Sequence, residues 1–222
     1  SGRKSTYRPV QIPEASSVTR IHQEDFCQAL GLPSRFKYER SGTVDRHFSA
    51  QNVVGMLRRT HAPDLNRRTF LRTTLFNLAI GNTDNHAKNH ALIYDQGATP
   101  RLAPLYDMLP IRLYERFTHE IAFEIGEAEY FDQMATSDLH NFMHICGLRT
   151  PGAIRRYCEN DLSPMLSTID AVADELTSRG QKDFDDLIGR KIGRLSELLT
   201  LNLEIRERDY FAPKGEGWGA MS

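Results

Sequence analysis

The sequence predicts a mainly α-helical domain of the α+β class, and two patterns in its 222 residues support that prediction. Apolar residues recur at helical spacing over 63–81, and helical patterns dominate from residue 137 onward. Between these regions, alternating stretches and turn residues over about 90–125 are typical of a few short β-strands. A chain of this length can bury one well-formed core, and its 40% apolar and 26% charged residues are ordinary for a globular protein.

Two helices are expected in the first quarter of the chain. Residues 1–19, which precede both helices, are polar and contain Pro and Ser, and this composition favours a connector. The stretch QEDFCQALG (23–31) predicts a helix with acidic residues in its first turn and Gly31 just past its end. The stretch SAQNVVGMLRRT (49–60) predicts a second helix, with Ser49 as its N-cap and basic residues at its end.

The third helix has the clearest pattern. It covers PDLNRRTFLRTTLFNLAIG (63–81), where Asp64 is a candidate N-cap and Gly81 ends the pattern. Its apolar positions at helical spacing are Leu71, Leu75, Leu78 and Ala79. We therefore expect one face of this helix to lie in the core.

Short strands are expected next. HALIYD (90–95) and RLAP (101–104) flank QGATP, a turn with Gly and Pro, and together they predict a small hairpin. THEIAFEI (118–125) alternates well enough to predict one more strand.

Helices complete the chain. They are predicted over 137–147, 151–180 and 181–209. The second is expected to break at Ser163-Pro164, because proline lacks a backbone donor and crowds the preceding turn. We expect residues 20–210 to form the domain and residues 211–222 a flexible tail.

Composition excludes several classes of protein. The formal net charge is −1, from 28 Lys and Arg against 29 Asp and Glu, so neither direct nucleic-acid binding nor an anionic membrane surface is expected. Three cysteines without a C-x-x-C pattern favour reduced thiols and a cytoplasmic location, and Cys27 and Cys146 are expected to be small buried hydrophobes. No apolar stretch approaches the roughly 18 residues that would indicate a transmembrane helix.

The polar stretch GNTDNHAKNHALIYD (81–95) is the candidate functional region, and metal binding is the first interpretation to weigh. His86 and His90 are four residues apart, but a zincin motif would need Glu at the position of Ala87. A calcium loop starting at Asn82 would need a bidentate Glu at its twelfth position, where Ile93 stands. For this His pair, and for His140 and His144, a structural or solvent-exposed role is favoured.

Phosphoryl transfer is the second interpretation. Protein kinases use a catalytic-loop Asp, an Asn five residues later and a second Asp further along the chain. Asp84 and Asn89 have that separation, and the predicted hairpin lies between them and Asp107. Lys88 could direct a positive charge towards the transferring phosphoryl group.

Three stretches in this order resemble one family: RIHQEDFCQALGLP with the following KYE, then GNTDNHAKNHAL, then RLAPLYDMLP. They are similar to the C-terminal lobe of HipA-like kinases, the toxins of bacterial toxin–antitoxin modules. The resemblance runs from about Arg20 to the last predicted helix. It implies the mostly helical C-lobe of a kinase-like fold, which uses ATP and Mg²⁺ to phosphorylate Ser or Thr on a protein.

The resemblance also implies residue roles. Asp84 would be the catalytic base, Asn89 and Asp107 would bind Mg²⁺, and His86 and Lys88 would lie near the phosphates. A structural or loop-positioning role is favoured for six further residues in matching stretches, Gln23, Glu24, Asp25, Lys37, Tyr38 and Glu39. The implied partners are a protein substrate such as a translation factor or aminoacyl-tRNA synthetase, a HipB-like antitoxin and a separate N-lobe chain.

The sequence departs from protein kinases in three ways. Asn82-Thr83 precede Asp84 where His-Arg would stand, and Tyr106-Asp107-Met108 replaces Asp-Phe-Gly. No G-x-G-x-x-G array or Walker-type loop occurs, so we expect this chain to begin at the hinge, without the N-lobe. Negligible kinase activity is therefore expected for the chain alone.

Two alternatives stay open at this point. The chain could be a non-catalytic remnant that binds a partner such as an antitoxin. It could also be a metal-dependent hydrolase, whose ligands would be Asp84, His86, His90 and Asp107.

Overall fold

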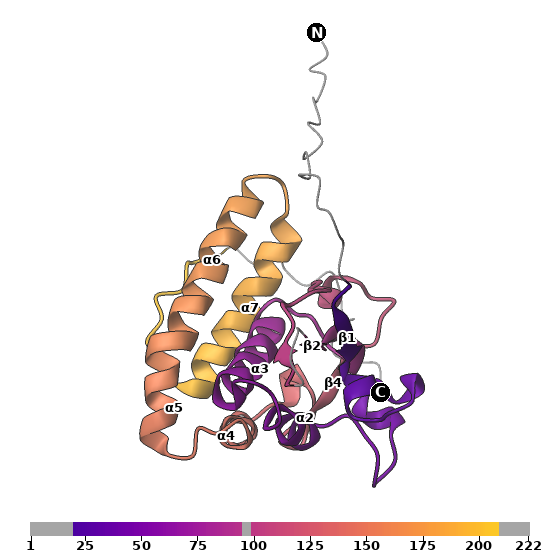
Figure 1. Cartoon of the computed structure of the whole chain (residues 1–222). Coiled ribbons are helices and arrows are strands. Elements are labelled where there is room, and N and C mark those ends of the chain that lie inside the picture. Colours follow the sequence, from indigo (N-terminus) through magenta and orange to yellow (C-terminus); the bar gives the residue numbers. More distant parts are fainter. Residues whose placement is uncertain (1–19, 95–98, 209–222) are drawn as a thin grey trace, which may run out of the picture.

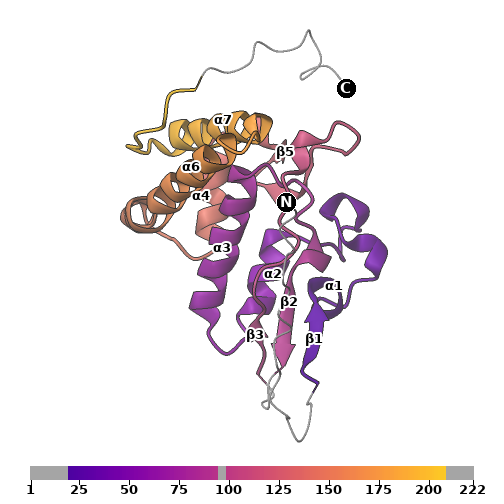
Figure 2. The ribbon, with the colours of Figure 1, turned by 90° about the horizontal axis from the view of Figure 1, so that it is seen from above.

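The computed structural model describes residues 20–94 and 99–208, and it confirms a mainly helical α+β domain. Its strands and α-helices are, in chain order, β1 (His22–Asp25), α1 (Phe26–Ala29), α2 (Ala50–Leu57), α3 (Pro63–Ala79), β2 (Ala91–Tyr94), β3 (Arg101–Leu102), β4 (Glu120–Ile125), β5 (Ala128–Tyr130), α4 (Thr136–Ile145), α5 (Pro151–Tyr157), α6 (Ser163–Thr177) and α7 (Lys182–Leu199). Helix α3 lies between the long helices α6 and α7 on one side and the strands β1 and β2 on the other (Figures 1 and 2). The predicted connector and tail fall in residues 1–19 and 209–222, outside the described part.

The two strands of the hairpin predicted over residues 90–104 pair antiparallel as predicted, and they belong to a three-stranded sheet. Most of the predicted turn falls in residues 95–98, outside the described residues. Strand β2 pairs with β3 through Leu92 and Leu102, and β1 pairs with the other edge of β2. The helix predicted over 23–31 is therefore wrong in its first turn, because residues 22–25 form β1.

Asp25 marks the change from strand to helix. Its carboxylate accepts the Gln28 N–H at 2.9 Å, while the Gln28 side chain accepts the Asp25 N–H at 2.9 Å. This reciprocal cap starts α1 at Phe26, and Gly31, with φ of 65°, follows the helix end as predicted. Glu24 and Asp25, which were predicted to lie in the first turn of a helix, therefore lie in β1, and Asp25 is the N-cap of α1.

A second sheet contains β4 and β5 in antiparallel pairing. Strand β4 matches the stretch predicted over 118–125, whereas β5 was not predicted because three residues carry too little alternation.

Helix α3 confirms the third predicted helix, with one correction at its start. Asp64 is not the N-cap: that position is Ala62, and Asp64 lies in the first turn, paired with Arg67. Pro63 occupies the first helical position, where its missing N–H costs nothing. Gly81, with φ of 71°, ends the helix and starts the polar loop.

For α2, Ser49 is the N-cap as predicted and accepts the Asn52 N–H at 3.3 Å.

The helix break predicted at Ser163-Pro164 does not occur. A π-helical turn over Cys158–Leu162 joins α5 to α6, and the Ser163 N–H donates to the Cys158 carbonyl five residues earlier. The wider turn absorbs the residues ahead of Pro164, which then lies in the first turn of α6, where proline is tolerated.

The last helix ends earlier than predicted, since α7 stops at Leu199 and Thr200 adopts a left-handed conformation with φ of 51°. Residues 201–208 then return beside α7. Arg208 pairs there with Asp170 and Asp185, and its guanidinium is almost fully buried. This ion-pair cluster fastens the end of the described chain to α6 and α7.

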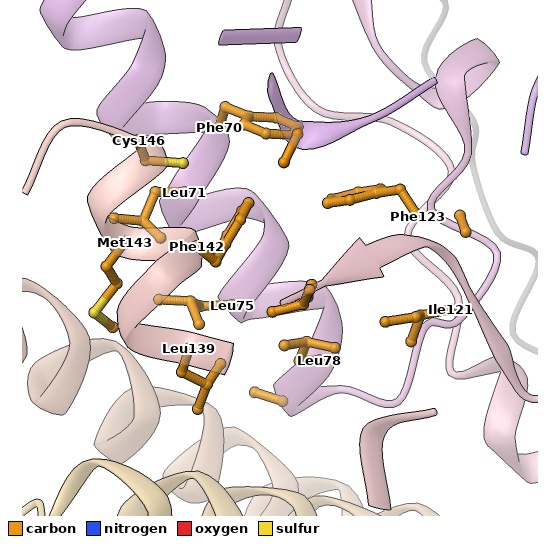
Figure 3. Packing of buried hydrophobic residues seen from close by; sticks show 14 of the residues in the cluster. Phe70, Leu71, Leu75, Leu78, Ile121, Phe123, Leu139, Phe142, Met143 and Cys146 are labelled. Atoms are coloured by element: carbon orange, nitrogen blue, oxygen red, sulfur yellow. The ribbon is translucent and has the colours of Figure 1, made fainter. Parts of the chain in front are cut away.

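The core is one cluster centred on α3, α4 and β4 (Figure 3). The side chains labelled there are Phe70, Leu71, Leu75, Leu78, Ile121, Phe123, Leu139, Phe142, Met143 and Cys146. Cys27 and Cys146 are buried as predicted, and both are free thiols. Within the described residues, no helix is long and apolar enough to cross a membrane.

Candidate active site

The predicted polar stretch is a loop between the end of α3 and strand β2. It contains a short 3₁₀ turn at Ala87–Asn89. Its polar side chains are largely buried, including those of Asn82, His86 and Asn89. Because buried polar groups need partners, the hydrogen bonds of this loop determine its shape.

Asn82 joins the two carboxylate-bearing segments of the predicted site. Its Oδ1 accepts the Asp84 N–H at 3.1 Å, and its Nδ2 donates to the Asp107 carbonyl at 3.3 Å and to Asn77 Oδ1 at 2.9 Å. We call this group of three contacts the Asn82 bridge. It brings together Asp84 and Asp107, which are 23 residues apart in the sequence.

The Asn82 bridge is the part of the site that the sequence analysis missed. In the sequence, Asn82 was noted only as the start of an incomplete calcium loop and as a departure from the kinase pattern. The available signal was a polar residue, Asn77, among apolar positions of α3 and five residues before Asn82.

Asn89 contacts Asp84 directly. Its Nδ2 donates to the Asp84 carbonyl oxygen at 2.7 Å, which turns the amide oxygen away from that carbonyl. An amide held by its NH₂ group presents its oxygen as a ligand for a hard cation.

Tyr38 contacts the Asp84 carboxylate itself. Its hydroxyl donates to Asp84 Oδ1 at 2.5 Å. Burial, together with this hydrogen bond, raises the pKa of Tyr38 well above its ordinary value of 10, so the phenol stays protonated and remains a donor.

His86 is buried beside Tyr38. Its ring lies edge-on to the Tyr38 ring at 5.2 Å, and its Nδ1 is buried without a hydrogen-bond partner among the described residues. Burial lowers the pKa of His86, although the charges of Asp84 and Asp107 act in the opposite direction. Both carboxylates therefore lie within electrostatic reach of this ring.

Lys88 is paired within the loop region. Its ammonium lies 3.4 Å from Asp25 Oδ2, and its backbone carbonyl accepts the Tyr106 hydroxyl at 2.7 Å. Lys88 thus links β1 and the segment before Asp107 to the loop, and its side chain remains partly exposed.

Asp107 is exposed and has a left-handed backbone with φ of 58°. Asp tolerates this region better than most residues, at some cost in strain that is often found at functional sites. The segment is held on its far side by the Arg112 N–H, which donates to the Gly81 carbonyl at 3.0 Å.

His90 lies among aromatic side chains and not beside Asp84 or Asp107. Its ring stacks on Phe26 at 5.0 Å and contacts Phe70 at 5.8 Å, and burial lowers its pKa to about 4. A neutral histidine in an aromatic cluster fits the favoured structural role. His140 and His144 are exposed on α4.

The six further residues of the matching stretches surround the loop. Lys37 accepts the Ala87 N–H at 3.0 Å through its carbonyl, and Glu39 accepts the Glu124 N–H at 2.7 Å. Glu24 accepts the Tyr94 hydroxyl at 2.7 Å, whereas Gln23 is exposed. With Asp25 and Tyr38 described above, five of the six make contacts that anchor the loop or its neighbours.

The donor set fits magnesium better than zinc. Within residues 20–94 and 99–208, no three His, Cys, Asp or Glu side chains gather closely enough to hold a metal by themselves. Mg²⁺ is usually bound by one or two carboxylates together with substrate phosphates, so oxygen donors from Asn89 and Asp107 suit it. The hydrolase alternative loses support because His90 lies among Phe rings.

Comparison with known proteins identifies the family. A model of the HipA-like C-terminal domain matches residues 6–178, which is more than half of the chain, and the chain belongs to this family. The resemblance noted in the sequence is thereby confirmed.

Relatives include two curated bacterial proteins. The chain is 36% identical over 157 residues to the putative kinase Y4mE of Sinorhizobium fredii, a match that covers 70% of this chain and 35% of that protein. It is 31% identical over 145 residues to the serine/threonine-protein kinase toxin HipA of Shewanella oneidensis, covering 62% of this chain and 33% of the relative. The chain therefore spans about a third of the length of these relatives.

A solved structure shares the fold. The HipA chain of Shewanella oneidensis MR-1, in a complex with HipB and operator DNA, superimposes with a TM-score of 0.70 at 25% identity. The match covers 86% of this chain and 46% of that one.

Proposed function

We propose that this chain supplies the catalytic loop and the metal ligands of an ATP- and Mg²⁺-dependent serine/threonine protein kinase. The observation that carries the proposal is the Asn82 bridge, which joins the Asp84 backbone to the Asp107 carbonyl. A kinase site needs its base and its metal-binding Asp fixed relative to one another, because positioning and charge provide most of the catalysis.

Asp84 is the proposed general base. Its Oδ1 accepts the Tyr38 hydroxyl, while its Oδ2 accepts no hydrogen bond from the described residues and can receive the proton of a Ser or Thr hydroxyl. Asn89 and Asp107 would hold Mg²⁺, which neutralises phosphate charge when bound. His86 would contribute to phosphate binding through its buried Nδ1, which has no hydrogen-bond partner among the described residues. Lys88 contributes through the anchoring of the loop.

The metal ligands can be tested on this chain. Mn²⁺, a paramagnetic substitute for Mg²⁺, is titrated with ATP into the isotope-labelled protein, and the broadening of backbone amide signals is followed. We expect broadening at Asn89 and Asp107, and Asp107→Asn should weaken it by about tenfold or more. The matched control is Asp45→Asn, an exposed carboxylate outside the loop sequence, which should leave the titration unchanged.

Catalysis requires a second experiment, because the chain covers about a third of its relatives. The chain is joined to the N-terminal lobe of a full-length relative, and ATP-dependent phosphorylation of proteins is measured. Asp84→Asn should reduce the rate by roughly 100-fold or more, since it removes the base. Equal rates for the two proteins would refute the assignment of Asp84.

A partner-binding role is the second candidate. The structural neighbour is HipA in a complex with HipB, which supports a HipB-like antitoxin as a partner of this chain as well. If Mn²⁺ and ATP fail to bind while the chain still binds its antitoxin, the non-catalytic alternative replaces the kinase proposal. A translation factor or an aminoacyl-tRNA synthetase remains the proposed class of substrate.

A further inference from the structure

Tyr38 reaches the proposed base from a segment 46 residues away in the sequence. Its hydroxyl oxygen lies 2.5 Å from Asp84 Oδ1, in a partly buried position. Hydrogen bonds from a hydroxyl to a carboxylate are short and strong, and this one fixes one carboxylate oxygen. The other oxygen is left to face an incoming hydroxyl.

The Tyr38 ring is itself held on several sides. The Arg40 guanidinium lies 4.2 Å from the ring centroid, the Lys37 ammonium 4.9 Å, and the His86 ring packs edge-on. Cations over an aromatic face are attracted by its negative charge. The ring therefore has little freedom to turn away from Asp84.

The residues on either side of Tyr38 connect two parts of the fold. Arg40 pairs with Glu120 at 3.2 Å and donates to the Ile121 carbonyl at 3.2 Å, so it is anchored to β4. Glu39 accepts the Glu124 N–H from the same strand. On the other side, the Lys37 carbonyl accepts the Ala87 N–H of the loop.

We propose that Tyr38 is a positioning residue that holds the Asp84 carboxylate in the single orientation in which Oδ2 meets the substrate hydroxyl. This inference rests on the proposed kinase function for its catalytic meaning, but the orientation itself can be measured without activity. Residues 37–40 connect β4 to the Asp84 carboxylate, because Glu39 and Arg40 contact β4 and the Tyr38 hydroxyl contacts Asp84.

The first experiment measures the orientation of Asp84 by NMR. Three-bond couplings to the Asp84 β-protons report the populations of its χ1 rotamers in the isolated chain. We expect one rotamer in the wild type and averaged couplings in Tyr38→Phe, which loses only the hydroxyl. The matched control is Tyr94→Phe, because Tyr94 also donates to a carboxylate, that of Glu24, on the outer sheet.

A second measurement covers the case in which Tyr38→Phe folds poorly. A hydroxyl proton in a short bond to a carboxylate exchanges slowly and resonates far downfield. We expect this signal from Tyr38 in the wild type and its loss or upfield shift in Asp84→Asn. A wild-type Tyr38 hydroxyl without such a signal would overturn the inference.

The third readout connects orientation to rate. In the two-lobe assembly described above, Tyr38→Phe should lower kcat roughly 10- to 100-fold and change KM for ATP less than about 3-fold. Averaged rotamers without any phosphoryl transfer would leave the positioning role intact and refute the kinase proposal. Fixed rotamers and an unchanged kcat in Tyr38→Phe would refute the positioning role and leave the kinase proposal intact.

Discussion

The Asn82 bridge predicts a specific loss of stability in Asn82→Ala. Asn82 is 4% exposed, and the substitution removes three hydrogen bonds at once, with Asn77, Asp84 and Asp107. Each such bond contributes about 1 kcal/mol net, so we expect a loss of about 3 kcal/mol in the free energy of unfolding. For a chain of this size, that corresponds to a fall in Tm of roughly 6–12 °C.

The assay is urea unfolding followed by circular dichroism, with the Mn²⁺ titration as the functional readout. The control is Asn52→Ala, because Asn52 donates one exposed side-chain hydrogen bond, to the His47 carbonyl at 3.0 Å. We expect that control to lose less than about 0.5 kcal/mol. If the two variants lose the same stability, the bridge contributes no more than an exposed contact and cannot be what joins Asp84 to Asp107.

Two further predictions concern the scaffold. Gly189→Ala should lower the free energy of unfolding by about 1–2 kcal/mol despite the better helix propensity of Ala, because a Cβ there would lie 2.6 Å from Arg208 Cδ and displace the buried guanidinium. Gly193→Ala, whose Cβ would meet no atom within 4 Å, should raise it by up to about 1 kcal/mol. Urea midpoints that move in the same direction in both variants would contradict this. Burial raises the pKa of Glu39 to about 7, above its ordinary 4.5, so its contribution to stability is complete below about pH 4.5 and is lost as the pH rises towards 7. The full shift corresponds to about 3.4 kcal/mol, which solvent screening of this partly buried carboxylate reduces to about 2 kcal/mol. Glu39→Gln should therefore gain about 2 kcal/mol relative to the wild type between pH 4.5 and 7.5, measured by urea unfolding at both pH values. A difference that does not change with pH would refute the raised pKa of Glu39.

Local patterns explain what the sequence predicted well. Helix α3, the Ser49 cap and the hairpin of β2 and β3 depend on neighbours in the chain, and each was predicted close to its observed bounds. Strand β1 was missed because its pairing with β2 joins residues about 70 apart, and no local signal separates HQED as a strand from HQED as a helix start. The π-helical turn was missed because proline indicates strain without indicating how the chain relieves it.

In the candidate site, too, local sequence patterns predicted some features and contacts between distant residues were missed. Residue types and spacing pointed to Asp84, Asn89 and Asp107, whereas the contacts that orient Asp84 involve Asn82 and Tyr38. Tyr38 was predicted to have a structural or loop-positioning role, but its contact with Asp84 joins residues 46 apart in the chain and could not be predicted from a local pattern. The sequence therefore suggests the residues of the proposed chemistry, whereas the contacts that orient Asp84 become visible only in the fold.

The way in which Asp84 is held has a consequence for the proposed catalysis. Its backbone N–H is bound by Asn82, its carbonyl by Asn89 and its carboxylate by Tyr38, so three independent contacts restrain one residue. A base oriented before substrate arrives does not have to be ordered during the reaction, which lowers the entropic part of the barrier. In the proposed kinase, Lys88 would act through its ion pair with Asp25, which secures the loop that presents Asp84. The positive charge at the phosphates would come from a metal ion that Asn89 and Asp107 would hold.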